Sequence, residues 1–476
     1  MNKLFIQGDW READGNKSYD LINPATEELI AAVSYAGNID TAMAIDAAKE
    51  AFKTWSKTTA YTRAGILKKT ADHIRNNAEQ FARDMVMESG KPLAEAKGEW
   101  AVAANLFEWY AEEGKRAYGR VIPTNRPDKR SSSIWQPMGV IGVITAWNFP
   151  AYNPARAWAA ALAAGCTVVA KPSENTPLSA FHMAEALSQS GLPKGVMNVV
   201  VGDAEAIGGE MLANPSLKKI SFTGSTRVGK ILMDGASKTH TKLSLELGGN
   251  APVLIFDDVD ADALAKVAAI ARFRNNGQVC IAPQRFYVHR KIYAQFAELV
   301  TNYVARLKVG NGFDADVQVG PLITKKQKDS VISLLDKARV EEAEILTGGG
   351  TPAHLQKGYF LQPAVVSNLK QSSVLAGNEI FGPVLPLFSF SDTDEAIAMA
   401  NDTEYGLAAY LFTNNINTAV HTSEQLEFGI VGINEWAPHG TESPFGGWKQ
   451  SGQGHESGSE GLFEYMEKKL ISIGGL

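Results

Sequence analysis

Short runs rich in β-branched and apolar residues alternate with amphipathic stretches between residues 139 and 256. Apolar residues recur at helical spacing over residues 177–189, 204–212 and 227–237. The strand candidates flank and separate them, at residues 140–145, 167–170, 197–201, 219–222, 242–245 and 252–256. Strand, helix and strand at this spacing predict βαβ units, and therefore a parallel sheet whose two faces are covered.

A second αβ series follows the first. Helical spacing marks residues 261–274, 293–307, 325–338 and 393–401, and strand candidates lie at residues 285–288, 363–366, 384–388 and 408–413. Upstream, residues 41–55, 62–77 and 78–89 show helical spacing, so we expect the N-terminal third to be mostly helical. The polar segment 120–133 fits neither series. The pattern predicts two α/β domains and an excursion.

The chain has 476 residues, which is too long for a single core. Its net charge is −6 and it shows no basic stripe, so a nucleic-acid partner is not expected. The longest apolar run, residues 157–170, is shorter than the roughly 18 residues that a membrane span needs, and residues 1–10 contain no apolar leader. With only two cysteines, the simplest expectation is a soluble protein of the reducing cytoplasm, without a membrane partner.

Cys280 is the strongest candidate for chemistry. An isolated cysteine is most often a small buried hydrophobe, as expected for Cys166 in front of a strand. Cys280, however, follows a polar turn of residues 275–278 (NNGQ), which should expose the sulfur near backbone donors. A nucleophilic thiol must be partly ionised, and such surroundings favour its ionisation.

A carboxylate and an amide accompany this thiol. Glu246 ends a predicted strand in front of Gly248 and Gly249, and ligands bind at the carboxyl edge of a parallel sheet. The glycines allow close approach of backbone or ligand, and burial would raise the pKa of Glu246 as a general base requires. Alone, Glu246 would be read as a solvated cap. Asn148 is either a turn residue or a donor to an oxyanion.

Nucleotide signals are indirect. Residues 224–230 have the spacing of a Walker A loop, but Ile231 stands where the metal-binding Ser or Thr belongs, which disfavours a P-loop NTPase. A helix that begins near Ser225 would still receive a pyrophosphate, and Lys171 and Glu174 follow another strand end. No metal motif occurs, and His439 and His455 are expected at the surface. We therefore predict no metal site.

The motifs, in this order along the chain, resemble those of the NAD(P)-dependent aldehyde dehydrogenase superfamily. They are residues 23–26 (NPAT), 147–150 (WNFP), 246–249 (ELGG), 273–280 (FRNNGQVC), 379–383 (EIFGP), 401–408 (NDTEYGLA) and 444–447 (PFGG). The resemblance implies a Rossmann-type dinucleotide-binding domain (1–118 and 138–247) and an α/β catalytic domain (248–446). It also implies a β oligomerisation arm (119–137 and 447–476) and a homo-oligomer, either a dimer or a tetramer.

By resemblance, Cys280 is the nucleophile, Asn148 the oxyanion donor and Glu246 the base that hydrolyses the thioester. The implied cofactor is NAD, with NADP possible. The implied cofactor-binding residues are Thr145, Trp147, Lys171, Ser173, Glu174, Gly202, Phe222, Gly224, Ser225, Gly229, Leu247, Glu379 and Phe381. Glu174 should repel a 2′-phosphate and so favour NAD.

Within the superfamily, residues 93–99, 111–116 and 244–252 are most similar to succinate-semialdehyde dehydrogenases. There, arginines at the positions of Arg156 and Arg274 hold the substrate carboxylate, for which a guanidinium fork is suited. The serine-containing substrate loop of that subfamily is here residues 435–442 (EWAPHGTE), and Ala157 replaces a common lysine. The changed loop leaves room for other anionic or hydroxylated aldehydes: glutarate semialdehyde, sulfolactaldehyde or lactaldehyde.

Two other classes of function stay open at this level. One is a catalytically silent protein on the same fold, against which the intact set of Cys280, Glu246 and Asn148 argues. The other is a cysteine hydrolase without redox chemistry, which the lack of a neighbouring histidine base disfavours. Each arginine has a plainer explanation too, as one half of a structural ion pair.

Overall fold

A largely parallel eight-stranded sheet forms the centre of the N-terminal lobe in the computed structural model, which describes residues 2–475. Its strands are β1 (Leu4–Ile6), β2 (Asp9–Arg11), β7 (Val140–Ile144), β8 (Thr167–Lys171), β9 (Met197–Val199), β10 (Leu217–Thr223), β11 (Lys242–Glu246) and β21 (Gly452–Gln453). They are ordered β2-β1-β9-β8-β7-β10-β11-β21. The five central strands are parallel, and β1 and β21 join them antiparallel. The predicted parallel sheet is confirmed, except that the last strand candidate, residues 252–256, belongs to the sheet of the second lobe.

Helices cover both faces of this sheet. The chain first moves outward from β7 to β9 through α5 (Tyr152–Ala164) and α6 (Leu178–Gln189). It then crosses back to β10 and β11 through α7 (Ala204–Ala213) and α8 (Thr226–Ser237). Right-handed crossovers in opposite directions put these two helix pairs on opposite faces. The direction reverses between β7 and β10, where a doubly wound sheet forms its ligand crevice.

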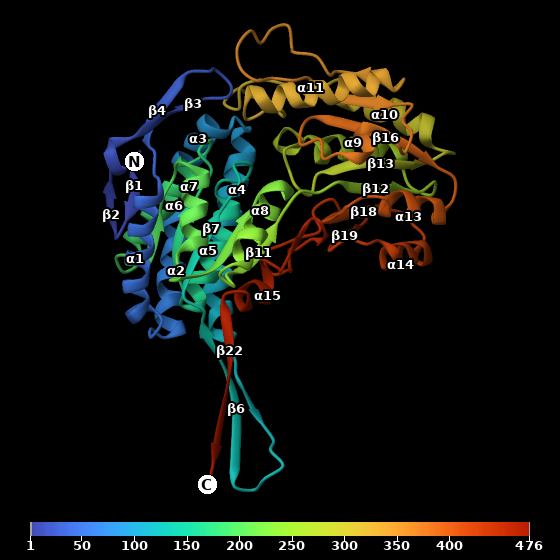
Figure 1. The fold of residues 1–476 in the computed structure, drawn as a ribbon. Coiled ribbons are helices and arrows are strands. Elements are labelled where there is room, and N and C mark those ends of the chain that lie inside the picture. The colour runs from blue at the N-terminus through green and yellow to red at the C-terminus, as the bar shows by residue number, and fades with distance from the viewer. Residues whose placement is uncertain (1, 476) are drawn as a thin grey trace.

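Further helices complete the two layers. The helix α4 (Leu93–Glu113) packs on α5 and on α2 (Ala60–Asn76), and α3 (Ala78–Ser89) packs on α4 and α6. On the opposite face, α1 (Asn38–Trp55) packs against α7 and β8. The layers are visible around the sheet in Figure 1.

The second lobe contains a seven-stranded sheet in the order β14-β15-β16-β13-β12-β18-β19, parallel except for β14. Its strands are β12 (Ala251–Ile255), β13 (Pro283–His289), β14 (Glu344–Thr347), β15 (Ala364–Ser367), β16 (Val384–Phe390), β18 (Ala408–Phe412) and β19 (Ile430–Ile433). Its helices are α9 (Ala261–Phe273), α10 (Tyr293–Val304), α11 (Lys325–Val340), α12 (Val374–Gly377), α13 (Thr393–Asn401) and α14 (Ile416–Gln425). A short pair, β17 (Tyr405–Gly406) with β20 (Trp448–Lys449), lies beside it.

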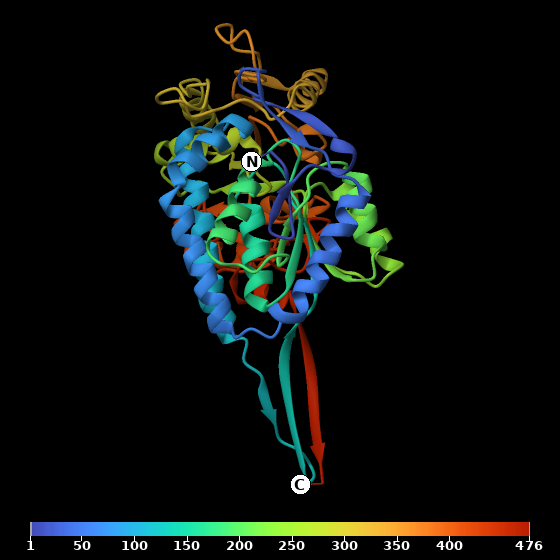
Figure 2. The same ribbon diagram turned by 90° about the vertical axis from the view of Figure 1, so that its left-hand side faces the viewer.

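A three-stranded ribbon extends from the base of the first lobe (Figures 1 and 2). It consists of β5 (Arg120–Ile122), β6 (Lys129–Pro137) and β22 (Met466–Gly474), with β6 in the middle. The predicted excursion is therefore a β-arm. Within the predicted arm segment 447–476, β21 and α15 (Gly458–Phe463) lie on the first lobe, and β22 alone enters the ribbon.

The expectation of a mostly helical N-terminal third is wrong for residues 4–34. These residues form β1, β2, β3 (Ser18–Ile22) and β4 (Leu29–Ser34), which are only three to six residues long and therefore too short to establish a period. The apolar run 157–170 combines the end of α5 with β8, separated by Gly165 at φ 95°. Among residues 2–475, no helix is both long and apolar enough to cross a bilayer.

Candidate active site

The loop that carries Cys280 has an unusual backbone. Asn275 (φ 48°), Asn276 (φ 57°) and Gly277 (φ 71°) are three consecutive residues in the left-handed region. Asparagine and glycine tolerate this region best, which explains why they occupy these positions. A Cβ on Gly277 would lie 2.4 Å from the carbonyl oxygen of Gly382. The turn follows the end of α9 and brings the Cys280 loop into contact with the first lobe, where Asn275 Nδ2 donates to the carbonyl oxygen of Asn148.

Two cavities meet at Cys280. The larger, about 550 Å³, lies over the carboxyl ends of β7, β8, β10 and β11. The smaller, about 310 Å³, is lined by Arg156, Arg274 and several aromatic side chains. Cys280 and Asn153 line both cavities. A group bound in either cavity therefore has access to the same sulfur.

The glycine pair after Glu246 has the predicted role of allowing close approach. A Cβ on Gly249 would lie 2.3 Å from the carbonyl oxygen of Cys280, and one on Gly248 would lie 2.7 Å from Glu379 Oε2. Any larger residue at Gly249 would displace the nucleophile loop. The Glu246–Gly249 segment thus passes directly beside Cys280.

Glu246 is 3% exposed and its Oε2 accepts no hydrogen bond. Burial raises its pKa well above the usual range, the nearby carboxylates of Glu456 and Glu464 raise it further, and Arg156 opposes the shift. A carboxyl with a raised pKa is the stronger base once it is ionised. The raised pKa expected from the sequence is present.

Cys280 differs from the expectation. Burial raises the pKa of its thiol to about 12, and the carboxylates of Glu246 and Glu379 add to the rise, although Arg156 opposes it. Burial therefore works against the expected ionisation of the resting thiol, even though Cys280 is half-buried and lines both cavities. Cys166 is fully buried and donates from Sγ to the carbonyl oxygen of Tyr465 at 3.2 Å, as befits a structural residue.

Asn148 lies in the segment that joins β7 to α5 and is 5% exposed. Its Nδ2 donates to the carbonyl oxygen of Gln278 at 3.1 Å, and its Oδ1 accepts from Asn153 at 3.3 Å. These bonds determine the plane of the amide and use one of its two N–H groups. Among the described residues the second N–H has no acceptor, so it is free to donate to a ligand.

The larger cavity gathers most of the predicted cofactor-binding residues. It is lined by Thr145, Trp147, Lys171, Ser173, Glu174, Phe222, Gly224, Ser225, Leu247, Glu379 and Phe381. Gly202 packs on Ala36 and Gly229 packs on Leu247, and neither lines the cavity.

Polar groups stand at several points of this cavity. Lys171 Nζ contacts Glu174 Oε1 at 2.5 Å, and α8 begins at its cap residue Ser225. At the other end, Glu379 Oε1 accepts from the backbone N–H of Gly249 at 3.0 Å, and burial raises the pKa of Glu379 to about 7. A helix N-terminus and a lysine–glutamate pair thus share one cleft, with an acidic group near the sulfur.

The two arginines of the smaller cavity differ in their partners. Arg156 is fully buried and forms an ion pair with the buried Glu456, and its guanidinium lies 4.4 Å from the Phe445 ring centre. Arg274 is exposed, lies 5.4 Å from the Phe149 ring centre, and has no carboxylate partner within residues 2–475. The alternative to substrate binding, a structural ion pair, therefore applies to Arg156 and not to Arg274.

The prediction that His439 lies at the surface is wrong. It is half-buried, lines the smaller cavity and packs against Tyr152 and Phe445. Burial, together with Arg274 and Arg156, lowers its pKa to about 4, so it is neutral at pH 7. The glycine-containing loop around His439 is typical of an exposed segment. The burial of His439 comes from its contact with Tyr152 of the first lobe, which the local sequence does not indicate. His455 is exposed as predicted.

Two further residues were missed, Lys91 and Glu99, which form a buried ion pair under the Asn148 segment. A signal for Glu99 existed, because it follows Ala96 by three positions and precedes Ala103 by four. That spacing places a carboxylate on the buried face of a helix, where it needs a partner.

Comparison with known proteins agrees with this geometry. The profile of the aldehyde dehydrogenase family matches residues 10–471. The glutarate-semialdehyde dehydrogenase of Pseudomonas aeruginosa is 43% identical over all of this chain and 98% of its own. The NADP(+)-linked succinate-semialdehyde dehydrogenase of Escherichia coli is 44% identical over 99% of this chain and 98% of its own.

The structure likewise superposes on a solved betaine aldehyde dehydrogenase of Staphylococcus aureus in complex with NAD+. The TM-score is 0.98 at 36% identity, over 100% of this chain and 95% of the other. The fold and the family expected from the motifs are thereby confirmed. With a free cysteine where two cavities meet and a match along nearly its whole length, the chain belongs to the aldehyde dehydrogenase family.

Proposed function

We propose that this enzyme oxidises an anionic aldehyde, with succinate semialdehyde as the main substrate, to the carboxylic acid with NAD. The observation that carries the proposal is the pair of cavities that meet at Cys280, one of them with an unpaired guanidinium at Arg274. The two semialdehyde dehydrogenases that resemble the chain support this substrate class.

The first chemical step is attack of Cys280 on the aldehyde carbon. The Sγ proton passes to solvent water, the sulfur forms a C–S bond with the carbonyl carbon, and the π electrons of the carbonyl group move to its oxygen. The free N–H of Asn148 and the backbone N–H of Cys280 then donate to this oxyanion, a role in which one donor accounts for roughly 100- to 1000-fold in rate. Arg156 favours the negative charge that develops near the sulfur.

The second step is hydrolysis. After hydride loss the substrate is a thioester on Cys280, and Glu246 takes a proton from the attacking water. The acid leaves and the sulfur regains a proton. The buried Oε2 of Glu246, which has no protein partner, is available for that water.

The larger cavity fits a dinucleotide. We propose that Lys171, Ser173 and Glu174 hold the adenosine ribose and that the α8 N-terminus at Ser225 faces the pyrophosphate. Thr145, Trp147, Phe222, Gly224, Leu247, Glu379 and Phe381 line the rest, while Gly202 and Gly229 act by packing. When bound, the nicotinamide accepts the hydride. The Glu174 carboxylate disfavours a 2′-phosphate, so we propose NAD rather than NADP.

Arg274 is proposed as the main contact of the substrate carboxylate. No carboxylate among residues 2–475 lies within ion-pair distance of it, and Glu95 acts on it only from further away, whereas Arg156 is paired directly with Glu456. The neutral His439 lines the same cavity, and it belongs to the loop that contains a serine in the related subfamily. This replacement keeps glutarate semialdehyde, 3-sulfolactaldehyde and lactaldehyde among the aldehydes to compare.

We propose that the enzyme is a homo-oligomer whose subunits contact each other through the arm. Support comes from the ribbon, which projects from the lobe and leaves Val121, Leu470 and Ile473 exposed. The cytoplasm is the proposed location, because Cys280 must remain a free thiol. The proposed domains are those expected from the motifs, with residues 447–463 placed beside the dinucleotide-binding sheet.

A panel of aldehydes with both cofactors tests the proposal. Succinate semialdehyde should give the highest kcat/KM with NAD, measured as NADH absorbance, and Cys280→Ser should abolish it. Highest activity with an uncharged aldehyde would refute the anionic substrate, and no reduction with any aldehyde would refute the catalytic assignment.

A further inference from the structure

The chemical steps above do not use the buried ion pair between Lys91 and Glu99. The two side chains are 1% and 3% exposed, and Lys91 Nζ lies 2.5 Å from Glu99 Oε2. Lys91 lies in the connection from α3 to α4, and Glu99 is on α4. A buried ion pair is costly to form, so it persists only where further hydrogen bonds hold both charges.

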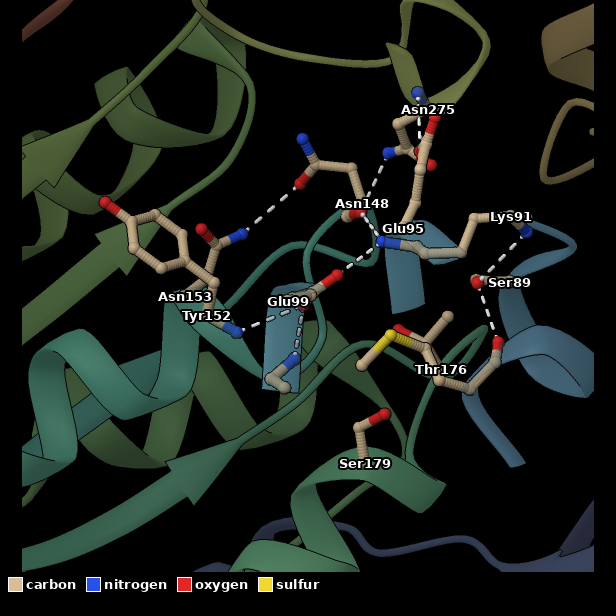
Figure 3. Close-up of polar contacts among 12 residues, drawn as sticks. Ser89, Lys91, Glu95, Glu99, Asn148, Tyr152, Asn153, Thr176, Ser179 and Asn275 are labelled. Atoms are coloured by element: carbon tan, nitrogen blue, oxygen red, sulfur yellow. Dashed lines mark hydrogen bonds and ion pairs between the residues drawn. The ribbon is translucent and has the colours of Figure 1, made fainter. Parts of the chain in front are cut away.

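Those further bonds all go to one segment, residues 148–152. Lys91 Nζ donates to the carbonyl oxygen of Asn148 at 3.0 Å. Glu99 Oε1 accepts from the backbone N–H groups of Ala151 at 2.8 Å and Tyr152 at 3.1 Å. Figure 3 shows the ion pair reaching both ends of the segment. The cation thus holds the residue proposed as oxyanion donor, and the anion holds the start of α5.

The nucleophile loop is attached to the same place. Asn275 Nδ2 donates to the carbonyl oxygen of Asn148 at 2.9 Å and to that of Gln278 at 3.2 Å (Figure 3 shows the first bond). The backbone N–H of Asn275 donates to Glu95 Oε2 at 2.9 Å. Glu95 and Glu99 are four residues apart and so lie on one face of α4. One helix face therefore holds the Asn148 segment and the Cys280 loop together.

The position of Asn148 relative to Cys280 is decisive for catalysis. An error of about 1 Å in a reacting group reduces rates by roughly 100-fold. The bond from Asn148 Nδ2 to the Gln278 carbonyl leaves only one N–H for the oxyanion, so a small rotation would misdirect it. We propose that Lys91 and Glu99 are positioning residues that aim the Asn148 amide at the oxyanion, acting through the backbone of residues 148–152. This inference rests on the proposed role of Asn148.

The test is a double-mutant cycle between Lys91 and Asn148. Lys91→Met should lower kcat by about 10- to 100-fold for charged and uncharged aldehydes alike. Because Lys91 also lines the smaller cavity, a loss confined to the KM of charged aldehydes would indicate direct substrate binding and would overturn the inference. Asn148→Ala alone should lower kcat by roughly 100- to 1000-fold. In the Asn148→Ala background, Lys91→Met should then lower kcat by no more than about 2-fold. Independent, multiplicative losses would overturn the inference.

The exposed ion pair between Lys97 and Glu79 is a matched control. It also joins α4 to α3, with Nζ and Oε2 2.6 Å apart and side chains 47% and 62% exposed. Lys97→Met with Glu79→Gln should leave kcat within about 2-fold of wild type. A loss as large as that of Lys91→Met would mean that disturbing any ion pair of α4 lowers the rate, and would overturn the specific role.

Variants of Glu99 control for the possibility that a substitution simply disturbs folding. Glu99→Gln keeps an oxygen that accepts from Ala151 and Tyr152, so it should retain more activity than Glu99→Leu, which does not. Hydrogen exchange of residues 148–155 should rise in Glu99→Leu and remain near wild type in the Lys97 and Glu79 control. Unchanged exchange in Glu99→Leu would overturn the inference, and this readout needs no substrate. A wild-type enzyme inactive on every aldehyde would instead refute the proposed function.

Discussion

Removing each arginine of the smaller cavity should have a different consequence. Arg274 has no carboxylate partner among residues 2–475, whereas Arg156 is paired with Glu456 in the interior. Arg274→Leu therefore removes a cation that is available to a substrate. Arg156→Met leaves a buried carboxylate unpaired. Both variants remove one guanidinium, so the difference between them isolates the effect of the partner.

The magnitudes follow from these environments. A hydrogen bond to a charged group contributes about 1.5–3 kcal/mol, and 1.36 kcal/mol is tenfold in rate. Because Arg274 is exposed, we expect the lower part of this range, roughly 10- to 30-fold in kcat/KM for succinate semialdehyde. Butanal has the same number of carbon atoms and no carboxylate, so its kcat/KM should change by less than about 3-fold. Leaving Glu456 unpaired should lower stability by about 3–5 kcal/mol.

The assay is steady-state NADH formation with both aldehydes, together with thermal unfolding of each variant. Arg156→Met should lower the melting temperature and impair both substrates, and Arg156→Met with Glu456→Gln should recover part of the stability. Equal losses for butanal and succinate semialdehyde in Arg274→Leu would refute the assignment of Arg274. A selective loss for succinate semialdehyde in Arg156→Met, at unchanged stability, would show that the roles are exchanged.

Three other predictions concern the remaining groups. Glu246→Gln should release about one NADH per active site in a burst and then turn over at least roughly 100-fold more slowly, because hydrolysis of the thioester lacks its base. Rapid mixing would detect the burst. Absence of the burst would mean that Glu246 acts before the thioester forms. Alkylation of Cys280 by iodoacetamide should rise about tenfold per pH unit without levelling off below pH 9, because thiolate forms only as the pH approaches a pKa of about 12, and a plateau near pH 7 would contradict this. Glu174→Gln should lower the ratio of NAD to NADP in kcat/KM by about tenfold, measured with saturating aldehyde, and an unchanged ratio would assign the selectivity to another residue.

Local signals were enough for the central elements. The strands at β7, β8, β10 and β11 were predicted to within two or three residues. Apolar residues are continuous in β7 and β8 and alternate with Lys or Ser in β10 and β11, and both patterns are typical of strands. The strands of residues 4–34 were missed because each is only three to six residues long, which is too short to show a pattern whether the strand is buried or exposed. Helix α5 was concealed inside an apolar run, since every residue after Tyr152 is buried and no polar stripe marks its spacing.

The sequence by itself determined where the candidate groups for the chemistry stand along the chain. Cys280, Glu246 and Asn148 stand in turns whose residue types, such as the left-handed Asn275, Asn276 and Gly277, have a local physical reason. The burial of these side chains and their hydrogen-bond and ion-pair partners depend instead on residues from distant parts of the chain.

Only the tertiary structure decided that burial raises the pKa of the Cys280 thiol, that Arg156 has an ion-pair partner while Arg274 has none among residues 2–475, and that Lys91 and Glu99 lie beneath Asn148. The charge state of a group and the free capacity of a donor depend on contacts between residues far apart in the sequence, and a motif contains no record of them.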